Sequence, residues 1–570
     1  MQMARKRSIA MVYPARFLGF AQTSRGIMVQ MRFLRIRQLS LFSFLLVRRL
    51  LLLLLWIVMS MLAGCDNNVS PSLPDGNAIS DENRIIPTEL PIIAATPTIL
   101  PSATVLPTPF VIHYSPGSTP TPDLPKPIKE HGTITITYAL QRGDTLSGIA
   151  VQFDVSEDVL HLANNLTIRQ ANRLRAGDSL LVPIPVDVHA PNVKLIPDSE
   201  LVNSPSAIGF GTAEFVHRFD GYLSHYTEQV DGDALTGIQI VQRVSEQFSV
   251  HPRLLLAALE HTGGWVTNAA PNDEARQYPL GYKRTNLNSL FTQLSWAAVR
   301  LNEGYYGWRL DNRYILRFDD GQYAFVGNNI NAGTAGLQNY IAAISTQANW
   351  LDALGEREHG FLSTYRRLFG DPWQFDVGEL VPVSARQPDL TLPFAKSELW
   401  YFTGGPHSSW ARGTPWGALD FASVNVTGCD PLLKDWVNAM SAGRITRSVH
   451  GEVAQSLDPR QDERAGWSVL YMHIGTPDRV NVGSWLKPGE RIGHPSCEGG
   501  VSGAAHVHVA RKYNGEWINA TGPRPFTLSA WQISESESGK EYDGYLTNSN
   551  TNQRREACDC KSPGKNGVSW

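Results

Sequence analysis

The chain has 570 residues, a formal net charge of −3 at pH 7 and an isoelectric point near 6.6. This length exceeds the size at which a single hydrophobic core keeps growing, so three or four domains are expected. The near-neutral balance argues against a strongly basic protein that binds nucleic acid through its overall charge, and we expect no nucleic-acid partner.

Residues 1–65 have the composition of a targeting segment and are excluded from the fold. Several arginines precede an apolar run that starts at Leu50, and the run ends in Leu62-Ala63-Gly64-Cys65. This ending resembles the lipobox of bacterial lipoproteins, which implies cleavage before Cys65 and a diacylglycerol on its thiol. A plain transmembrane anchor is the alternative, but residues 50–64 are short for a span of about 20 residues. The resemblance implies an extracytoplasmic protein that is lipid-anchored to the cell membrane and faces the cell wall.

Residues 66–130 form a linker rich in proline and threonine, with repeated Thr-Pro pairs. Such a composition buries no core and adopts extended conformations of the polyproline type. At about 3 Å per extended residue, the linker would reach more than about 100 Å and would carry the following domains from a membrane into a wall layer. The alternative is a disordered stalk without that purpose.

Residues 131–186 show the order strand, helix, helix, strand. The expected elements are a strand at 134–138, a helix opened by a turn at 142–150, a helix at 155–164 and a strand at 174–183. With its Gly-Asp-Thr-Leu turn, the unit resembles a LysM domain. The resemblance implies binding to glycans that contain N-acetylglucosamine, with Asp144, Thr145 and the 166–174 loop facing the sugar chain. The alternative is a small packing module that binds nothing.

Residues 205–380 turn to a helical pattern. Apolar residues recur at helical spacing in residues 236–248, 252–260, 290–301 and 337–344. The second of these stretches ends in Glu260 and resembles the helix that carries the catalytic glutamate of lysozyme-like transglycosylases. By that resemblance, burial would raise the pKa of Glu260 and let it protonate a glycosidic oxygen. The family follows its glutamate with Ser-Gly-aromatic, whereas here His261-Thr262 intervene before Gly263-Gly264-Trp265. This departure favours a helical domain that binds glycan or only spaces its neighbours.

Residues 390–533 are dominated by short strands separated by glycine turns, which predicts an antiparallel β domain. Strands are expected at 443–447, 467–471, 479–482 and 506–512. Because side chains alternate along a strand, His506 and His508 are expected to point to the same face. His407, Asp420 and one histidine of that pair could supply the three ligands of a catalytic zinc, with a fourth position left for water.

The motifs Gly-Gly-Pro-His, ending at His407, and Leu-Asp-Phe, around Asp420, resemble the M23 metallopeptidases, the lysostaphin and β-lytic group of peptidoglycan endopeptidases. The resemblance implies zinc held by His407, Asp420 and His508, with His473 and His506 orienting the water and stabilising the oxyanion. It implies a wall-anchored zinc endopeptidase that hydrolyses peptide bonds in peptidoglycan. The alternatives are a non-catalytic peptidoglycan-binding scaffold or activator of other wall hydrolases, and glycan cleavage by the middle domain.

The five cysteines agree with an exported protein. If lipidation uses Cys65, an even number remains outside the membrane, where disulfides persist. Cys429 and Cys497 both lie between motifs of the expected peptidase and are the first choice for a bridge. Cys558 and Cys560 are close enough to share a metal, but two ligands make a poor site, so a disulfide is preferred.

Together the segments predict a multidomain α+β protein. It comprises a small βααβ LysM module, a mainly α-helical lysozyme-like middle domain and a mainly antiparallel β peptidase domain. The last 37 residues, 534–570, are polar and suggest no role.

Overall fold

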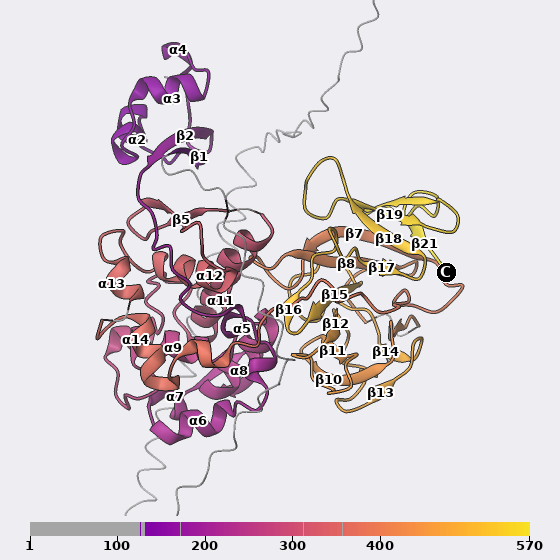
Figure 1. The fold of residues 1–570 in the computed structure, drawn as a ribbon. Coiled ribbons are helices and arrows are strands. Elements are labelled where there is room, and N and C mark those ends of the chain that lie inside the picture. The colour runs from indigo at the N-terminus through magenta and orange to yellow at the C-terminus, as the bar shows by residue number, and fades with distance from the viewer. Residues whose placement is uncertain (1–125, 127–131, 172, 312, 356, 432–433) are drawn as a thin grey trace, which may run out of the picture. The chain divides into compact units, whose positions relative to one another are not determined.

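The computed structural model describes residue 126 and residues 132–570, apart from residues 172, 312, 356 and 432–433 (Figure 1). The predicted targeting segment 1–65, with Cys65, lies outside the described residues, as does the linker 66–130 except for Lys126. Helices and antiparallel sheets occupy different stretches of the described chain, which confirms the predicted multidomain α+β class. In the part of the chain that the structure describes, no helix is both long and apolar enough to span a membrane.

The first module is a two-stranded antiparallel sheet with helices between its strands. Its elements are β1 (Gly132–Ala139), α2 (Leu146–Gln152), α3 (Glu157–Ala163), the short α4 (Ile168–Ala171) and β2 (Ser179–Val186). The predicted βααβ order is present, with α4 as an addition. Thr145 caps α2 by accepting a hydrogen bond from the backbone N–H of Gly148. Ile149, Leu160 and Val182 are buried between the helices and the sheet.

The middle part is mainly helical. Its helices are α5 (Asp198–Leu201), α6 (Thr212–Phe219), α7 (Tyr222–His225), α8 (Gly237–Phe248), α9 (Pro252–Gly263), α10 (Asp273–Gln277), α11 (Leu290–Arg309), α12 (Ala332–Ala342), α13 (Trp350–Leu354) and α14 (Phe361–Phe369). Two hairpins accompany them, β3 (Thr227–Val230) with β4 (Asp233–Thr236), and β5 (Ile315–Arg317) with β6 (Tyr323–Phe325). The four helices expected from apolar spacing correspond to α8, α9, α11 and α12. α11 continues past its expected end at residue 301, because Tyr305, Tyr306 and Trp308 are buried against other elements.

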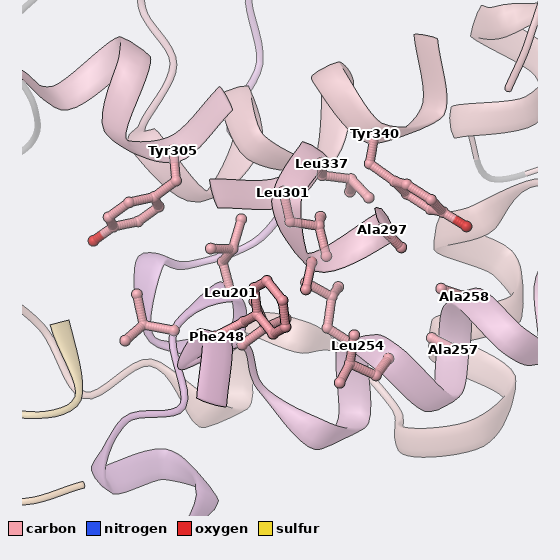
Figure 2. Close-up of a cluster of buried hydrophobic side chains, with 14 of the residues drawn as sticks. Leu201, Phe248, Leu254, Ala257, Ala258, Ala297, Leu301, Tyr305, Leu337 and Tyr340 are labelled. Carbon is pink, nitrogen blue, oxygen red and sulfur yellow. The ribbon is translucent and has the colours of Figure 1, made fainter. Parts of the chain in front are cut away.

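These helices pack around a common apolar core, part of which Figure 2 shows. Leu201 of α5, Leu254 of α9 and Leu301 of α11 are fully buried there. α11 and α12 approach closely, because a Cβ on Gly304 would lie only 2.6 Å from the carbonyl oxygen of Ala335. The position of α11 is therefore fixed by close packing, which matters for the site described below.

The third part is built from antiparallel strands. They are β7 (Trp400–Ser408), β8 (Trp416–Ser423), β9 (Val437–Asn438), β10 (Gly443–Val449), β11 (Glu452–Ser456), β12 (Trp467–Met472), β13 (Trp485–Leu486), β14 (Arg491–Gly493), β15 (Val507–Tyr513), β16 (Glu516–Trp517), β17 (Thr527–Leu528), β18 (Trp531–Glu535), β19 (Gly544–Asn548), β20 (Arg554–Glu556) and β21 (Gly567–Val568). The main sheet has the order β13-β10-β11-β12-β15-β8-β7-β21, with β16 paired to β15. Residues 479–482, expected as a strand, lead into a turn instead, because the chain reverses there and the backbone N–H of Ser484 bonds to the carbonyl of Asn481.

The segment 534–570, for which the sequence suggested only a polar tail, is folded into this third part. β21 pairs with β7, and β18, β19 and β20 form a small sheet with β17. Trp531, Ile533 and Leu546 are buried under this small sheet, while their strand neighbours Gln532, Ser534 and Tyr545 are exposed or half-buried. Disulfides join Cys429 to Cys497 and Cys558 to Cys560.

Both faces of the main sheet carry buried apolar side chains. One face contributes Leu419, Phe421, Val469, Tyr471, Val507 and Val509 to the core of the third part. The opposite face contributes Ala418, Leu470, Met472 and Ala510 to the same apolar cluster as the buried side chains of the helices. Since side chains alternate along a strand, Asp420 and His508 lie on this second face, next to the residues that the helices cover.

Candidate metal centre

Three neighbouring strands bring the expected ligands together. His407 lies near the end of β7, Asp420 within β8 and His508 near the start of β15. β8 is hydrogen-bonded to both of the other strands, and His508 stands directly opposite Asp420. The register of β7 shifts on either side of Gly404, an irregularity of the kind that re-aims a side chain. All three side chains are buried.

The three donor atoms have the spacing of a metal site. The Nε2 atom of His407 lies 2.9 Å from Nδ1 of His508 and 3.2 Å from Oδ1 of Asp420. Nδ1 of His508 and Oδ1 of Asp420 are 3.4 Å apart. Ligands of a tetrahedral zinc, at bond lengths near 2 Å, stand about 3.3 Å from one another. Oδ1 of Asp420 is buried without a hydrogen-bond partner, an unfavourable state that a bound cation would relieve. The residues therefore fit zinc.

Backbone carbonyls orient the two imidazole rings. Nδ1 of His407 lies 2.8 Å from the carbonyl oxygen of Gly405, and Nε2 of His508 lies 3.0 Å from that of Ser409. Because a carbonyl only accepts, these nitrogens carry the protons, and the opposite nitrogens turn their lone pairs toward Asp420. Burial acts to raise the pKa of Asp420, but when the surrounding rings are protonated the histidines, His407 first, outweigh burial and hold that pKa well below its usual range.

The two further histidines face the same centre from outside ligand distance. The ring of His473, which follows β12, lies 4.5 Å from the ring of His506. Nε2 of His506 is 3.7 Å from Oδ1 of Asp420. Burial, with the neighbouring histidines, lowers the pKa of His473 to about 3. The five residues singled out in the sequence thus converge on one place, and His506 and His508 do point to the same face.

Tyr542 belongs to this centre and was missed in the sequence. Its ring stacks on that of His407 with centroids 4.4 Å apart. The turn that carries it is held by two backbone hydrogen bonds, from the N–H of Gly405 to the Tyr542 carbonyl and from the N–H of Tyr542 to the Pro406 carbonyl. Tyr542 adopts a left-handed conformation with φ of 70°, uncommon for an aromatic residue and consistent with a position imposed by its surroundings.

The centre opens into a cleft of about 1300 Å³. His407, Asp420 and His508 line it together with Trp410 and Tyr542 of the third part. The end of α11 lines it as well. A cleft of this size with convergent polar groups is typical of a substrate-binding site.

Glu260 has a different environment from the one expected of a general acid. Its carboxylate accepts hydrogen bonds from the backbone N–H groups of Val266 and Thr267 and from the Thr267 hydroxyl. Nη2 of Arg367 lies 3.0 Å from Oε1 of the same carboxylate. These donors tie the turn after α9 to its helix. Glu260 is not among the residues that line the cleft, and glycan cleavage there stays a prediction.

Asp144 and Thr145 both serve the local structure of the first module. The carboxylate of Asp144 accepts from the Tyr138 hydroxyl at 2.9 Å and from the backbone N–H of Gln141 at 2.7 Å. Thr145 is the N-cap of α2. These contacts shape the turn between β1 and α2, and the role of both residues in binding glycan stays a prediction.

Comparison with known domain families gives two matches. Residues 138–183 match the LysM domain. The predicted LysM module is thereby confirmed. Residues 194–384 match the family described as LasA, N-terminal domain, over the span for which the sequence resembled lysozyme-like proteins. No curated protein matches the chain.

Several solved structures resemble the chain. An M23 metalloprotease, pseudoalterin from the deep sea, is 25% identical over 30% of this chain and 96% of its own, with a TM-score of 0.25. The catalytic domain of lysostaphin from Staphylococcus simulans is 21% identical over 21% of this chain and 87% of its own, with a TM-score of 0.16. The catalytic domain of the M23 protein EnpA from Enterococcus faecalis is 17% identical over 23% and 95%, with a TM-score of 0.17.

Proposed function

We propose that this protein is a zinc-dependent endopeptidase that hydrolyses peptide bonds in peptidoglycan and is directed to the glycan by its LysM module. The observation that carries the proposal is the donor set of His407, Asp420 and His508, spaced for zinc around a buried carboxylate oxygen without a hydrogen-bond partner. Two further histidines and an open cleft beside this set support catalysis rather than a closed structural site.

His407, Asp420 and His508 would hold the ion. Zinc at such a site polarises a peptide carbonyl and lowers the pKa of a water molecule toward neutrality. Nδ1 of His473 lies 3.1 Å from the carbonyl oxygen of Glu498, and Nδ1 of His506 lies 2.8 Å from that of Ala504. In the neutral rings these nitrogens carry the protons, so each Nε2 is free to accept one.

His506 is the better placed of the two to take a proton. Its Nε2 lies 3.7 Å from Oδ1 of Asp420, and its side chain lines the cleft and is 16% exposed, whereas His473 is buried. The proton accepted by Nε2 can then pass to the amine that leaves when the peptide bond breaks. His473, buried beside it, is suited to orient the attacking water through its own Nε2.

The lipid anchor at Cys65 and the extracytoplasmic, wall-facing location belong to the same proposal. They are supported by the lipobox-like sequence at residues 62–65. The two disulfides also favour an oxidising compartment outside the cytoplasm.

Digestion of purified peptidoglycan tests the proposal. The soluble chain from residue 66 onward is incubated with the polymer, with and without a zinc chelator, and the products are analysed by mass spectrometry. We expect new peptide termini that disappear with the chelator and with His473→Ala. Glu260→Gln serves as the control for glycan cleavage and is expected to leave the products unchanged. Binding to the wall without any product would instead favour a non-catalytic scaffold.

A further inference from the structure

One wall of the cleft comes from the middle helical part. Glu303, Tyr306 and Gly307 of α11 and its C-terminal cap Leu310 line the same cleft as the metal ligands. We call these four residues the α11 wall. The sequence placed the metal ligands and this helix in separate domains, with no sign that they share a site.

Buried hydrogen bonds hold the α11 wall against the third part. The Tyr306 hydroxyl accepts a hydrogen bond from the backbone N–H of Trp517 at 2.9 Å. The hydroxyl of Tyr305 donates to the Glu516 carboxylate at 3.1 Å. Both tyrosines are buried, and Trp517 of β16 belongs to the apolar cluster of the helices. Removing either part would leave these polar groups and the apolar face of the sheet without partners.

The loop between the first two metal ligands also rests on α11. Residues 409–415 join β7 to β8, and Nε of Arg412 lies 2.8 Å from Oε1 of Glu303. Gly413 has φ of +93°, and a Cβ there would lie 2.7 Å from the carbonyl oxygen of Val299 in α11. The same loop supplies the Ser409 carbonyl that orients His508. A continuous set of contacts therefore runs from α11 to a metal ligand.

We propose that the α11 wall is part of the substrate-binding site of the peptidase, so that the middle part helps to select the peptide that is cleaved. The inference rests on the proposed function. Leu310 and Val501 both line the cleft. Leu310 is 43% exposed, and Val501 is fully exposed. Two exposed aliphatic side chains at one cleft favour a peptide with an uncharged, apolar side chain next to the metal centre. Glu303 is a positioning residue, because it holds the 409–415 loop through Arg412.

Steady-state kinetics on a soluble stem-peptide fragment of peptidoglycan tests the apolar contact. Leu310→Gln is expected to raise KM about fivefold through loss of apolar contact, with kcat and zinc content unchanged. The matched control is Leu351→Gln, a change at a leucine of α13 that is 51% exposed and does not line the cleft. Equal KM values for the two variants would overturn the inference.

Zinc titration tests the positioning role without relying on activity. Glu303→Gln is expected to weaken zinc binding about threefold or more, because the loop that orients His508 is released. Asp273→Asn, which removes the exposed Asp273–Arg276 pair of α10, is the control and should leave zinc affinity unchanged. Identical affinities for both variants would contradict the positioning role.

Calorimetric binding of the same fragment separates the two proposals. Suppose that the zinc-loaded protein binds the fragment without cleaving it, and that Leu310→Gln weakens this binding. The proposed role of the α11 wall in binding is then supported, and the proposed catalysis is contradicted. If cleavage occurs and Leu310→Gln behaves like Leu351→Gln, only the α11 wall fails. If the fragment neither binds nor is cleaved, both are overturned.

Discussion

At the scale of single residues, the proposed roles of the histidines depend on which ring nitrogen faces Asp420 and at what distance. His407 and His508 turn lone pairs toward Asp420, at distances of 3.2 and 3.4 Å. His506 approaches the same oxygen only to 3.7 Å, and its ring is held by the carbonyl of Ala504. Geometry therefore distinguishes the two histidines proposed as ligands from His506, although all three face one cleft.

Substitution of His506 and His508 should separate these roles. His508→Ala removes one of three donors, so both bound zinc and peptidase activity should be lost. His506→Ala leaves the donor set complete, so zinc should be retained while activity falls about 100-fold or more. Metal content by atomic absorption and hydrolysis rates on the same preparations check both. Full zinc occupancy in His508→Ala would contradict the ligand assignment.

His261 should make the stability of the protein depend on pH. Burial lowers its pKa to about 4, and Nδ1 is buried without a hydrogen-bond partner. In the unfolded chain the pKa is about 6.5, so between pH 6.5 and 4 the unfolded state binds a proton that the native state does not. The contribution is fully present above pH 6.5 and declines by about 3 kcal/mol as the pH falls to 4.

Urea unfolding of the wild type and His261→Gln measures this contribution. The wild type should lose more free energy of unfolding between pH 6.5 and 4 than the variant does. The comparison is of slopes, because other groups titrate equally in both proteins. Parallel slopes would show that His261 is protonated in the folded state at the same pH as in the unfolded chain.

At the scale of elements, the turn between β18 and β19 completes the candidate metal centre. It places the ring of Tyr542 on that of His407, and the carboxylate of Glu541 accepts from the backbone N–H of Ser408 at 2.8 Å. Tyr542→Ala should weaken zinc binding about three- to tenfold, the range expected for losing a stacked aromatic pair. Tyr542→Phe keeps the ring and is the control. Competition with a chromophoric chelator measures both, and equal affinities would rule out a supporting role.

The elements show where sequence patterns succeed and where they fail. The period of two correctly predicted that His506 and His508 share a face, because that property depends only on neighbouring residues. Residues 479–482 alternate like a strand, but the chain turns there, with the backbone N–H of Ser484 bonded to the Asn481 carbonyl, and no strand forms. Tyr542 lies more than 100 positions from His407 and carries no motif, so its stacking could not be foreseen from the sequence. The contact between Arg412 and Glu303 escaped prediction for the same reason.

At the scale of the whole described chain, the main sheet shares its apolar residues between two cores. Leu470 and Ala510 pack with the helices, while Val469 and Val509 beside them face the opposite way. A buried hydrogen bond also links the two parts, because the side-chain amide of Gln247 in α8 donates to the carboxylate of Glu452 in β11. Such extensive burial favours a cooperative unit rather than two domains that fold separately.

A chain limited to residues 388–570 tests this cooperativity. Without the helices it would expose Leu470, Met472 and Trp517, so it should associate in light scattering and melt about 5 °C or more below the longer chain. A chain that starts at residue 187 lacks the linker and the LysM module and is the control, because it keeps Leu470, Met472 and Trp517 covered. Its zinc affinity should match that of the chain from residue 66. A monomeric 388–570 fragment with unchanged stability would mean that the third part folds alone, and the shared cluster would then be a contact between independent domains.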